Sequence, residues 1–598
     1  MGKNFLSSGY KYLKSFEKDI IPTFVYEVNG IKIEKQICME YGKNTVCVYY
    51  KVNGGNMPCK LCLAPILNFR DFHSASTDHE FSLVQSIKQR KVKAIIDENK
   101  TTPVYFYASE GEYIEHHNDT FRNMYYLWED RRGFYPEENH VVAGKYEIEV
   151  KPYEEKKITF VCSLEENIEE IDGAKVIANE IKRVEKIVRD SKLIKKPKTK
   201  EEEKNMRLIE TLVKQTDTFL VYRDFTRLHT IIAGYHWFLD WGRDALISFE
   251  GLLLLTKRFD MAKEVLLTFA RDIKFGLVPN GYSGYDNRPL YNSVDSSLLL
   301  FEQIKKYLNY TNDYVFIREN FYEKLKTIIH SYENGIDLDD NNIYLDKDGL
   351  LVSGTENTQN TWMDAKVSGF VVTPRNGKAV EINSMWYNAL CILQELAMKF
   401  CDEQTAKYAE ELAKKCKKSF TKSFYNKNQK CLYDVVGDSK IRPNQMFSVA
   451  LSYPVLDPAS KQAKEMLETV KTKLKNKYGL KTLAKGEKNY IDVYCGDAFK
   501  RDMSYHQGPT WPWLLGMFID GWKNIIEAEK NEKKKQEQTE ELAKYIETLR
   551  KTYLEVVEDG VCVGSIPELF DSKSPYKPGG TISQAWSVAE LLRIFCQN

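Results

Sequence analysis

The chain has 598 residues, which suffices for about two to four domains and for at least one large core. Its 86 Lys and Arg nearly balance its 85 Asp and Glu, so no strong positive field attracts nucleic acid or an acidic membrane surface. No apolar run approaches the roughly 18 residues that a membrane span needs, and residues 1–20 lack the apolar centre of a signal peptide. We therefore expect a cytoplasmic protein with neither nucleic acid nor a membrane as partner.

The N-terminal part is predicted to form strands, because its apolar residues follow the two-residue period of a sheet. Residues 45–52, 102–107, 146–150 and 158–163 alternate or are rich in β-branched and aromatic side chains, with Asn-Gly and Gly-Gly turns between them. The pattern predicts an antiparallel β-sandwich, and we assign residues 1–190 to it as an accessory domain.

Twelve cysteines are spread along the chain without regular spacing, and we interpret them as reduced thiols. Cys59 and Cys62 have the spacing of metal ligands, but no second Cys or His pair follows at zinc-finger distance. We interpret this pair as two half-buried thiols of a strand. We expect neither a metal nor an organic cofactor.

The rest of the chain is predicted to be helical. A helix near 172–194 leads into residues 191–204, a string of Lys, Glu and Pro that we interpret as a charged linker. Apolar residues then recur at spacings of three and four in the segments 205–222, 243–256, 259–275, 291–308, 312–333, 380–400, 403–422, 444–452, 458–475, 510–527, 536–557 and 581–596.

Many of these segments are too apolar to face water on any side, which predicts an all-α domain over residues 205–598. We prefer a closed (α/α)6 toroid of inner and outer helices over a superhelical array, which has the same periodicity. Residues 334–379 form a connection far longer than usual, so we expect function to concentrate at such loops.

Four loop stretches together supply aromatic rings, His, Arg and carboxyl groups, the mixture that a sugar pocket needs. They are residues 235–244, 361–364, 505–513 and 566–568. Aromatic rings stack on the apolar faces of a sugar, while guanidinium and carboxylate groups bind its hydroxyls. The composition therefore favours a carbohydrate ligand.

Hydrolysis of a glycoside needs one protonated carboxyl and one carboxylate. Asp364 follows Trp362 and Met363, whose apolar bulk favours the raised pKa of an acid catalyst. Glu568 follows Pro567, which holds the chain extended just before a predicted helix. A surface position or a helix cap also explains each carboxyl. We hypothesise that Asp364 and Glu568 form the catalytic pair.

The other polar residues leave structural alternatives open. Asp240 and Asp244 lie four apart, where Arg243 can pair with a carboxylate purely as structure. Residues 375–381 also fit a turn that enters a helix, and His506 is a lone histidine among aromatic residues.

Taken together, these blocks resemble the amylo-α-1,6-glucosidase family of the glycogen debranching enzymes, in that family's order. The similar blocks are Trp237 to Asp244 with its Trp-Gly-Arg-Asp, Arg375-Asn-Gly-Lys378 with Glu381-Ile-Asn, Arg442-Pro-Asn444, His506-Gln-Gly with Trp511-Pro-Trp513, and Gln584-Ala-Trp-Ser587. Arg70-Asp-Phe-His73 and residues 119–133 are similar to the family's accessory β domain. The resemblance covers nearly the whole chain and implies one two-domain enzyme.

By this resemblance the chain releases glucose from α-1,6 branch points of glycogen or limit dextrin during glycogen breakdown. Asp364 would be the general acid and Glu568 the general base of an inverting reaction, with their carboxyls roughly 6.5 to 9.5 Å apart. Arg243 and Asp244 would hold the released glucose. The expected substrate-binding residues are Trp237, Asp240, Trp241, Arg243, Asp244, Trp362, Arg375, Lys378, Glu381, Arg442, Asn444, His506, Gln507, Trp511, Trp513, Gln584 and Trp586. The expected partner is a branched α-glucan, and no oligomeric state is predicted.

The chain departs from the family in two ways. We expect no room for the amylase-like barrel with which the longer, eukaryotic members perform 4-α-glucanotransfer. Asp571-Ser572 and Gly580-Thr581 differ from the Gly expected after the catalytic Glu and the Cys expected before the Gln-Ala-Trp block. Two alternatives stay open: a glucoamylase- or trehalase-like exo-glucosidase on the same scaffold, and a non-catalytic glucan-binding protein.

Overall fold

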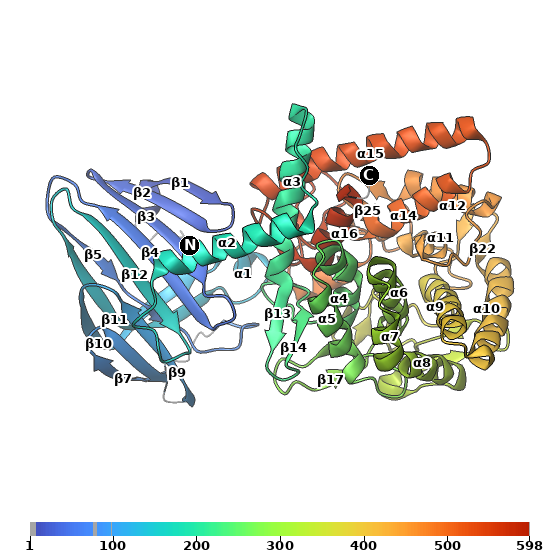
Figure 1. Ribbon diagram of the computed structural model, residues 1–598, viewed down its shortest axis with the longest axis horizontal. Helices are drawn as coiled ribbons and strands as arrows, with labels where there is room; N and C mark the ends of the chain where they lie inside the picture. The colour runs from blue at the N-terminus through green and yellow to red at the C-terminus, as the bar shows by residue number, and fades with distance from the viewer. Residues whose placement is uncertain (1–7, 76–80, 97–98, 597–598) are drawn as a thin grey trace. The chain divides into compact units, whose positions relative to one another are not determined.

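The structure is a computed structural model that describes residues 8–75, 81–96 and 99–596. Residues 1–7, which enter the prediction of location, lie outside the described part. The chain divides into two compact units, Met1–Ile187 and Val188–Asn598. Figure 1 draws the strands of the first unit in blue and cyan and the helices of the second from green to red.

The N-terminal unit consists of two antiparallel sheets. The larger sheet contains, in spatial order, β1 (Leu13–Lys18), β2 (Pro22–Val28), β3 (Ile31–Met39), β4 (Thr45–Asn53), β12 (Glu155–Ser163), β9 (Asn99–Ala108), β8 (Lys91–Ile96) and β7 (Leu83–Lys88). The smaller sheet contains β10 (Glu112–Tyr125), β11 (Glu137–Val150), β5 (Cys59–Leu63) and β6 (Ile66–Leu67). A short helix, α1 (Leu127–Arg131), connects β10 to β11. Because β4, β9, β11 and β12 contain the predicted strand segments, the predicted antiparallel region is confirmed.

The two sheets share one hydrophobic core. Buried residues recur at short intervals along β11, so one face of its sheet turns toward the core. That core joins Phe106 and Ile158 of the larger sheet to Tyr146 and Ile148 of the smaller sheet. Removing these side chains from water holds the sheets face to face.

Cys59 and Cys62 both lie in β5. Because they are three residues apart in a strand, their side chains point to opposite faces of the sheet. Cys59 is half-buried, whereas Cys62 is exposed, which corrects the prediction that both are half-buried. The pair therefore does not converge on a common ligand.

The second unit is mainly helical. Its helices are α3 (Lys200–Thr216), α4 (Gly242–Phe249), α5 (Phe259–Arg271), α6 (Asp295–Thr311), α7 (Tyr314–Asn320), α8 (Tyr322–Asn334), α9 (Val380–Lys399), α10 (Glu403–Phe424), α11 (Phe447–Ala450), α12 (Lys461–Lys473), α13 (Ala498–Tyr505), α14 (Leu514–Glu527), α15 (Glu532–Asp559) and α16 (Ala585–Cys596). Within the described ranges, none of the helices is long and apolar enough to cross a membrane.

The charged segment before α3 is shorter than predicted. The preceding helix, α2 (Gly173–Ser191), ends where the linker was expected to begin, but α3 already starts at Lys200. Thr199 starts α3 because its hydroxyl accepts a hydrogen bond from the backbone N–H of Glu202 at 3.1 Å. Only residues 192–199 lack a helix or strand there.

Helix contacts in this unit follow a closed cycle. In the order α4, α6, α9, α11, α14 and α16, each helix contacts the next, and α16 contacts α4 again. These inner helices are buried on most sides; every residue of α4 is buried. The flanking helices bury a single stripe, as α10 does against α9 with Ala409, Ala413, Cys416, Phe420 and Phe424. Figure 1 shows α9 and α10 side by side.

Side-chain caps start several of the flanking helices, although α5 and α8 begin without one. The flanking helices α3, α10, α12 and α15 begin with side chains that accept a backbone hydrogen bond: Thr199, Asp402, Ser460 and Asn531. The inner helices α4, α6, α9 and α14 begin without such a cap. Their uncapped N–H groups leave the positive end of the helix dipole open, and Asp244, Asp295 and Glu381 stand in the first turns of α4, α6 and α9.

Most predicted helices are found within a few residues of their expected ends. The segment predicted at 312–333 is two helices, α7 and α8, because the chain leaves helical geometry at Phe321. The short α13 was not predicted. Residues 335–379 separate α8 from α9, as expected for the long connection.

Short strands fix the loops near the inner helix starts. One sheet contains β24 (Lys475–Asn476), β25 (Gly479–Lys481), β26 (Thr510–Trp511), β27 (Leu569–Phe570) and β28 (Pro578–Gly579). Because β27 directly follows Glu568, this sheet positions that carboxyl. β29 (Ser583–Gln584) pairs with β15 (Gly234–Tyr235) and places Gln584 just before α16.

Candidate active site

Asp364 lies in the long connection before α9 and is bound to Arg243, in the first turn of α4. Arg243 donates from Nη1 to Asp364 Oδ2 at 2.8 Å and from Nε to Asp295 Oδ2 at 2.7 Å. Burial opposes the charge of Arg243, but Asp295 and Asp364 raise the pKa of the guanidinium above its usual value. A permanent cation therefore positions Asp364.

Asp364 is the more open of the two predicted catalytic carboxyls, with 32% of its side chain exposed. Burial raises the pKa of Asp364 above its usual value, against the charge and the hydrogen bond of Arg243. The charge of Asp295 adds to this rise in pKa. Asp364 thus holds a proton more readily than an exposed aspartate does.

Glu568 is only 2% exposed. The Tyr505 hydroxyl donates to Glu568 Oε1 at 2.5 Å, and the Thr581 N–H donates to Oε2 at 3.1 Å. Burial nevertheless raises the pKa of Glu568 to about 7, and the charge of Asp364 contributes to the rise. The two carboxyls, far apart in the sequence, therefore interact electrostatically within one site.

Gly580 makes room for the Glu568 carboxylate. Its φ is +68°, and a Cβ atom built on it would lie 1.9 Å from Glu568 Oε2. Both the backbone conformation and the space exclude a side chain at this position. The next residue, Thr581, donates from its hydroxyl to Gln584 Oε1. Both residues of this departure from the family pattern thus shape the surroundings of Glu568.

Asp244 is a third carboxyl of the same site. It accepts a hydrogen bond from Gln584 Nε2 at 3.2 Å. Burial raises the pKa of Asp244 well above its usual value against the opposing charge of Arg243, and the charges of Glu568 and Asp364 reinforce the rise. The charges of the three carboxyls therefore act on one another in this buried site.

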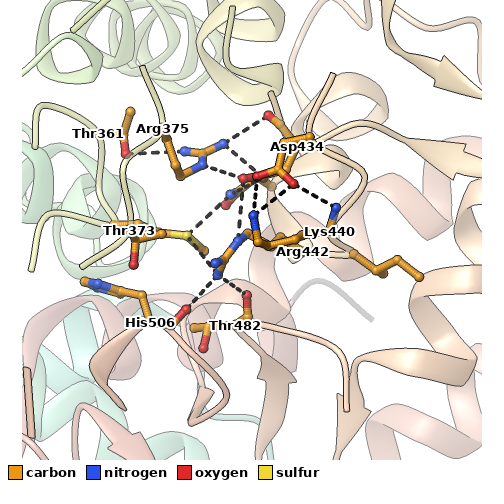
Figure 2. Close-up of polar contacts among 12 residues, drawn as sticks. Thr361, Thr373, Arg375, Asp434, Lys440, Arg442, Thr482 and His506 are labelled. Atoms are coloured by element: carbon orange, nitrogen blue, oxygen red, sulfur yellow. Dashed lines mark hydrogen bonds and ion pairs between the residues drawn. The ribbon is translucent and has the colours of Figure 1, made fainter. Parts of the chain in front are cut away.

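A second polar cluster is built around Arg375 and is shown in Figure 2. Arg375 donates to both carboxylate oxygens of Glu381 and of Asp434, with Nε to Asp434 Oδ2 at 2.6 Å. Burial opposes the charge, but these carboxylates raise the pKa of Arg375 above its usual value. Because Glu381 stands in the first turn of α9, residues 375–381 do form a turn that enters a helix.

Asn444 connects this cluster to the Asp364 loop. It donates from Nδ2 to Asp434 Oδ1 at 2.8 Å and accepts from Trp362 Nε1 at 2.7 Å. Trp362 precedes Asp364 by two residues, and 3% of it is exposed. The ion-pair cluster therefore holds the backbone from which Asp364 projects.

Arg442 connects the cluster to the segment after α13, as Figure 2 shows for His506. It donates from Nη1 to the His506 carbonyl at 2.7 Å and from Nη2 to Gln507 Oε1 at 3.0 Å. Gln507 in turn donates to the Val372 carbonyl at 3.2 Å. Burial lowers the pKa of His506 well below its usual value, and the charges of Arg442 and Arg243 lower it further, so this histidine is neutral.

Tryptophans pack together in the same region. The ring centres of Trp362 and Trp513 are 5.0 Å apart, and the rings of Trp513 and Trp586 are stacked at 5.1 Å. Trp362, Trp511, Trp513 and Trp586 are each at most 4% exposed. These rings pack on one another and support the site, and their expected contact with sugar stays a prediction. Trp237 and Trp241, in contrast, are half-buried.

Asp240 pairs with a residue outside the site formed by Asp244, Asp364 and Glu568. It lies before the start of α4 and accepts a hydrogen bond from Arg223. Asp240 and Asp244 therefore do not share a helical face, which corrects the sequence interpretation. The structural alternative, an ion pair, describes Asp240 correctly, but its cation is Arg223 instead of Arg243.

Lys378 is also held in an ion pair of its own. Its Nζ donates to Asp346 at 2.6 Å and to Asp348 at 2.7 Å. These bonds fix the end of the long connection before α9. They also pair the ammonium group of Lys378, which was expected to bind substrate, with two carboxylates of the chain.

The sequence did not single out Asp295, Asp434 or Tyr505. Asp295 opens a predicted inner helix, as Glu381 does, so a carboxyl at an uncapped helix start was a usable signal. Tyr505 stands in the aromatic block before His506 and was recognised only as part of that block. Asp434 lies in an irregular turn, where nothing in the local pattern marks it.

In the part of the chain that the structure describes, no group of three or more His, Cys, Asp and Glu side chains is arranged to hold a metal ion. The cations of the site are guanidinium groups. The arrangement combines two carboxyls in contrasting surroundings with a third carboxyl and Arg243 beside them, which suits acid and base chemistry on a polar, uncharged ligand.

The sequence model of amylo-alpha-1,6-glucosidase matches residues 214–593. The chain belongs to the amylo-alpha-1,6-glucosidase family. A second model, described as glycogen debranching enzyme N terminal, matches residues 2–157. The predicted family and the predicted class of enzyme, a glycoside hydrolase, are thereby confirmed.

A curated relative in this family is the glycogen debranching enzyme of Saccharomyces cerevisiae, 25% identical over 451 residues. The match covers 59% of this chain and 29% of the yeast protein, so the chain spans less than a third of that relative. A crystal structure of bacterial glucoamylase complexed with acarbose has a similar fold, with a TM-score of 0.59 at 12% identity over 100% of this chain and 87% of the other. The likeness supports the order of an antiparallel β region followed by a glucoamylase-like helical part.

Proposed function

We propose that this member of the amylo-alpha-1,6-glucosidase family hydrolyses α-1,6-linked glucose at branch points of glycogen or limit dextrin, with inversion at the anomeric carbon. One observation carries the proposal: Asp364 and Glu568 interact within one site but have contrasting surroundings. Asp364 is partly open and bound to a cation, while Glu568 is enclosed and receives neutral donors. Acid–base hydrolysis of a glycoside requires such a pair.

Exposure supports Asp364 as the general acid. In a pocket that admits one terminal glucose, the acid protonates the oxygen that leads out to the rest of the substrate, so it stands nearer the opening than the base. The side chain of Asp364 is 32% exposed, and Glu568 is 2% exposed. A pKa of about 7 suits Glu568 to removing a proton from water near neutral pH.

In this proposal Arg243 and Asp244 hold the glucose. Arg243 Nη2 and Asp295 Oδ1 are buried without a hydrogen-bond partner among the described residues. A buried donor and acceptor without partners are costly unless a ligand satisfies them. The hydroxyls of a glucose ring supply both kinds of partner, and the half-buried Trp237 and Trp241 offer ring surface to its apolar face.

In the proposed reaction, Asp364 donates its proton to the glycosidic oxygen while the bond from that oxygen to the anomeric carbon breaks. Glu568 takes a proton from a water molecule that attacks the opposite face of the sugar. The products are β-glucose and a debranched chain. Inversion requires the two carboxyls to lie roughly 6.5 to 9.5 Å apart, with the water between Glu568 and the sugar.

The closed cycle of contacts among the inner helices supports an (α/α)6 toroid for the helical unit. Its mouth would be the end at which the inner helices start, because Asp244 and Asp295 stand there. A branched α-glucan is the proposed partner. The cytoplasmic location expected from the sequence belongs to the same proposal, and cell fractionation checks it.

Glucose release from a glucosyl-branched dextrin by the purified protein tests the proposed activity, with the anomer of the first glucose followed by NMR. We expect β-glucose. An initial α-anomer would contradict inversion. Glucose from maltose or trehalose but not from the branched dextrin would support the exo-glucosidase alternative, and dextrin binding without glucose release would support the non-catalytic one.

A further inference from the structure

A hairpin projects from the chain directly after Asp364. Its strands are β20 (Lys366–Val367) and β21 (Phe370–Val371), and the Val372 N–H closes its base by donating to the Ala365 carbonyl at 3.0 Å. Ser368 and Gly369 both have positive φ, at 50° and 81°, which is the conformation of a tight two-residue turn that matches strand twist. The turn holds Phe370 in a fixed position with 56% of the residue exposed.

We call this hairpin the first arm of the site. The second arm is α13, which leads to Glu568. The Asp497 side chain caps α13 by accepting from the Lys500 N–H at 2.9 Å, and the helix ends at Tyr505, whose hydroxyl donates to Glu568. Phe499, in the first turn of α13, is 53% exposed. Six residues of helix place Phe499 about 9 Å along the axis from Tyr505.

The two arms are joined to each other. α13 contacts β20, and Gln507, two residues beyond α13, donates to the Val372 carbonyl and to Thr373 Oγ1 at the base of the hairpin. A single exposed phenylalanine needs no explanation. Here, however, each predicted catalytic carboxyl has an arm of its own, each arm carries an exposed phenylalanine, and the arms are in contact.

We propose that Phe370 and Phe499 form a stacking platform for the α-1,4-linked main chain that carries the branch. The inference rests on the proposed function, in which Asp364 protonates the oxygen that leads to that main chain. The substrate beyond the scissile bond therefore leaves the site on the side of Asp364, where the hairpin begins. Phenyl rings bind the apolar faces of glucose without a hydroxyl-specific contact, so they accept any glucose of a uniform chain.

The platform distinguishes substrates by the length of the glucan beyond the scissile bond. Isomaltose has one glucose there, whereas a glucosyl-branched dextrin has a main chain that reaches across both arms. We expect the double variant Phe370→Ala with Phe499→Ala to raise KM for the branched dextrin about tenfold, since each lost ring contact weakens binding severalfold. The kcat/KM for isomaltose and the thermal midpoint should not change, because both side chains are exposed.

The matched control is Phe275→Ala, which removes an exposed phenylalanine from the loop after α5, next to Gly276, which lies close to Ser331 of the flanking helix α8. It should leave the KM for both substrates unchanged. The proposal would be overturned if wild type and the double variant had the same KM for the dextrin. It would also be overturned if the double variant lost as much kcat/KM on isomaltose as on the dextrin.

Binding separates this inference from the proposed function. Calorimetric titration with linear maltoheptaose needs no catalysis, and we expect wild type and Phe275→Ala to bind it alike and the double variant about tenfold more weakly. If wild type releases no glucose from either substrate while this difference persists, the proposed function fails and the platform stands. Equal binding by all three proteins would overturn the platform, whatever the enzyme hydrolyses.

Discussion

The inner helices carry two buried layers of charge, and the two layers differ in how their carboxyls are paired. The first layer, at the helix starts, contains Arg243 and Asp295, with Asp364 and Glu568 from the loops. The second lies about 10 Å further along the chain's helical axes, because Glu250, which opens the π-helical turn that continues α4, follows Arg243 by seven residues, as Glu302 follows Asp295 in α6. The same helices therefore carry both layers.

Cations pair the carboxyls of the second layer. Lys306 Nζ lies 2.7 Å from Glu250 Oε2. Arg593 Nη1 lies 2.7 Å from Asp520 Oδ2, and Arg593 Nη2 lies 2.6 Å from Glu590 Oε2. Burial alone would raise the pKa of Glu250, but Lys306 and Arg593 hold that pKa below its usual value.

Among the described residues Glu568 has no cation as a hydrogen-bond partner, and its pKa rises to about 7. Burial acts to raise the pKa of both Glu568 and Glu250, and at Glu250 the adjacent cations reverse the shift. In the first layer a buried carboxyl is left reactive, and in the second the carboxyls are held in ion pairs.

Removing a carboxyl of the first layer should have the largest effect. We expect Glu568→Gln and Asp364→Asn each to lower kcat/KM for a branched dextrin about 10²- to 10⁴-fold, the usual contribution of a general acid or base. Steady-state glucose release measures this. Glu590→Gln, in the second layer, is the control and should stay within about twofold per folded molecule, because the layers are well separated.

α-Glucosyl fluoride sharpens the same comparison, since fluoride leaves without being protonated. Asp364→Asn should keep most activity on this substrate, whereas Glu568→Gln should lose activity on both substrates. The reverse pattern would exchange the proposed roles of the two carboxyls. Full activity of both variants on the dextrin would remove the pair from the mechanism.

Breaking the second layer should cost stability instead of chemistry. Arg593→Met leaves the buried Glu590 and the half-buried Asp520 without their cation, so we expect the free energy of unfolding of the helical unit to fall by about 3–5 kcal/mol. Urea denaturation followed by fluorescence measures it. Arg207→Met removes an exposed pair with Glu558 and should cost less than about 1 kcal/mol. Similar losses in both variants would contradict the assigned difference between buried and exposed pairs.

The raised pKa of Glu568 predicts a stability cost that depends on pH. From its usual value of 4.5 up to about 7, the unfolded chain has released the Glu568 proton while the folded chain retains it, so the contribution of Glu568 to stability falls as pH rises. Glu568→Gln should therefore be more stable than wild type by up to about 3 kcal/mol at pH 8 and equal to it near pH 4. Urea titrations across this range test it, and parallel curves for the two proteins would contradict the raised pKa.

The smallest expected effect concerns the neutral donor of the first layer. Tyr505→Phe removes the hydroxyl that donates to the ionised Glu568, so the pKa of Glu568 should rise by about one unit. Because the base must be ionised, the acid limb of the kcat/KM profile should move upward by the same amount. Tyr545→Phe is the control, since that buried hydroxyl has no partner among the described residues. An unmoved acid limb would show that Tyr505 does not tune the base.

Much of the fold could be predicted because the apolar period reports burial. The alternating strands became β4, β9, β11 and β12, and the segments with three-and-four spacing became nearly all the long helices. The break at Phe321 was missed because apolar spacing continues across it while the backbone turns. The start of α3 was missed because its first turn is charged and exposed, so only the cap at Thr199 marks it.

The site was less predictable, because its geometry depends on partners that are remote in the sequence. Motif composition identified the regions of Asp364, Glu568 and Arg375, but it could not show that Lys378 pairs with Asp346 and Asp348. It also could not separate tryptophans that line a pocket from tryptophans packed on one another. The local sequence shows which functional groups a segment carries, while tertiary contacts determine which of these groups are already paired within the protein.

The contact between Gly580 and Glu568 also bears on which substitutions this chain tolerates. Any larger residue at position 580 would have to displace the carboxylate, since a single added carbon would overlap Oε2. The helices and the packed tryptophans do not depend on this contact, so such a variant would lose the position of one carboxyl and keep its fold.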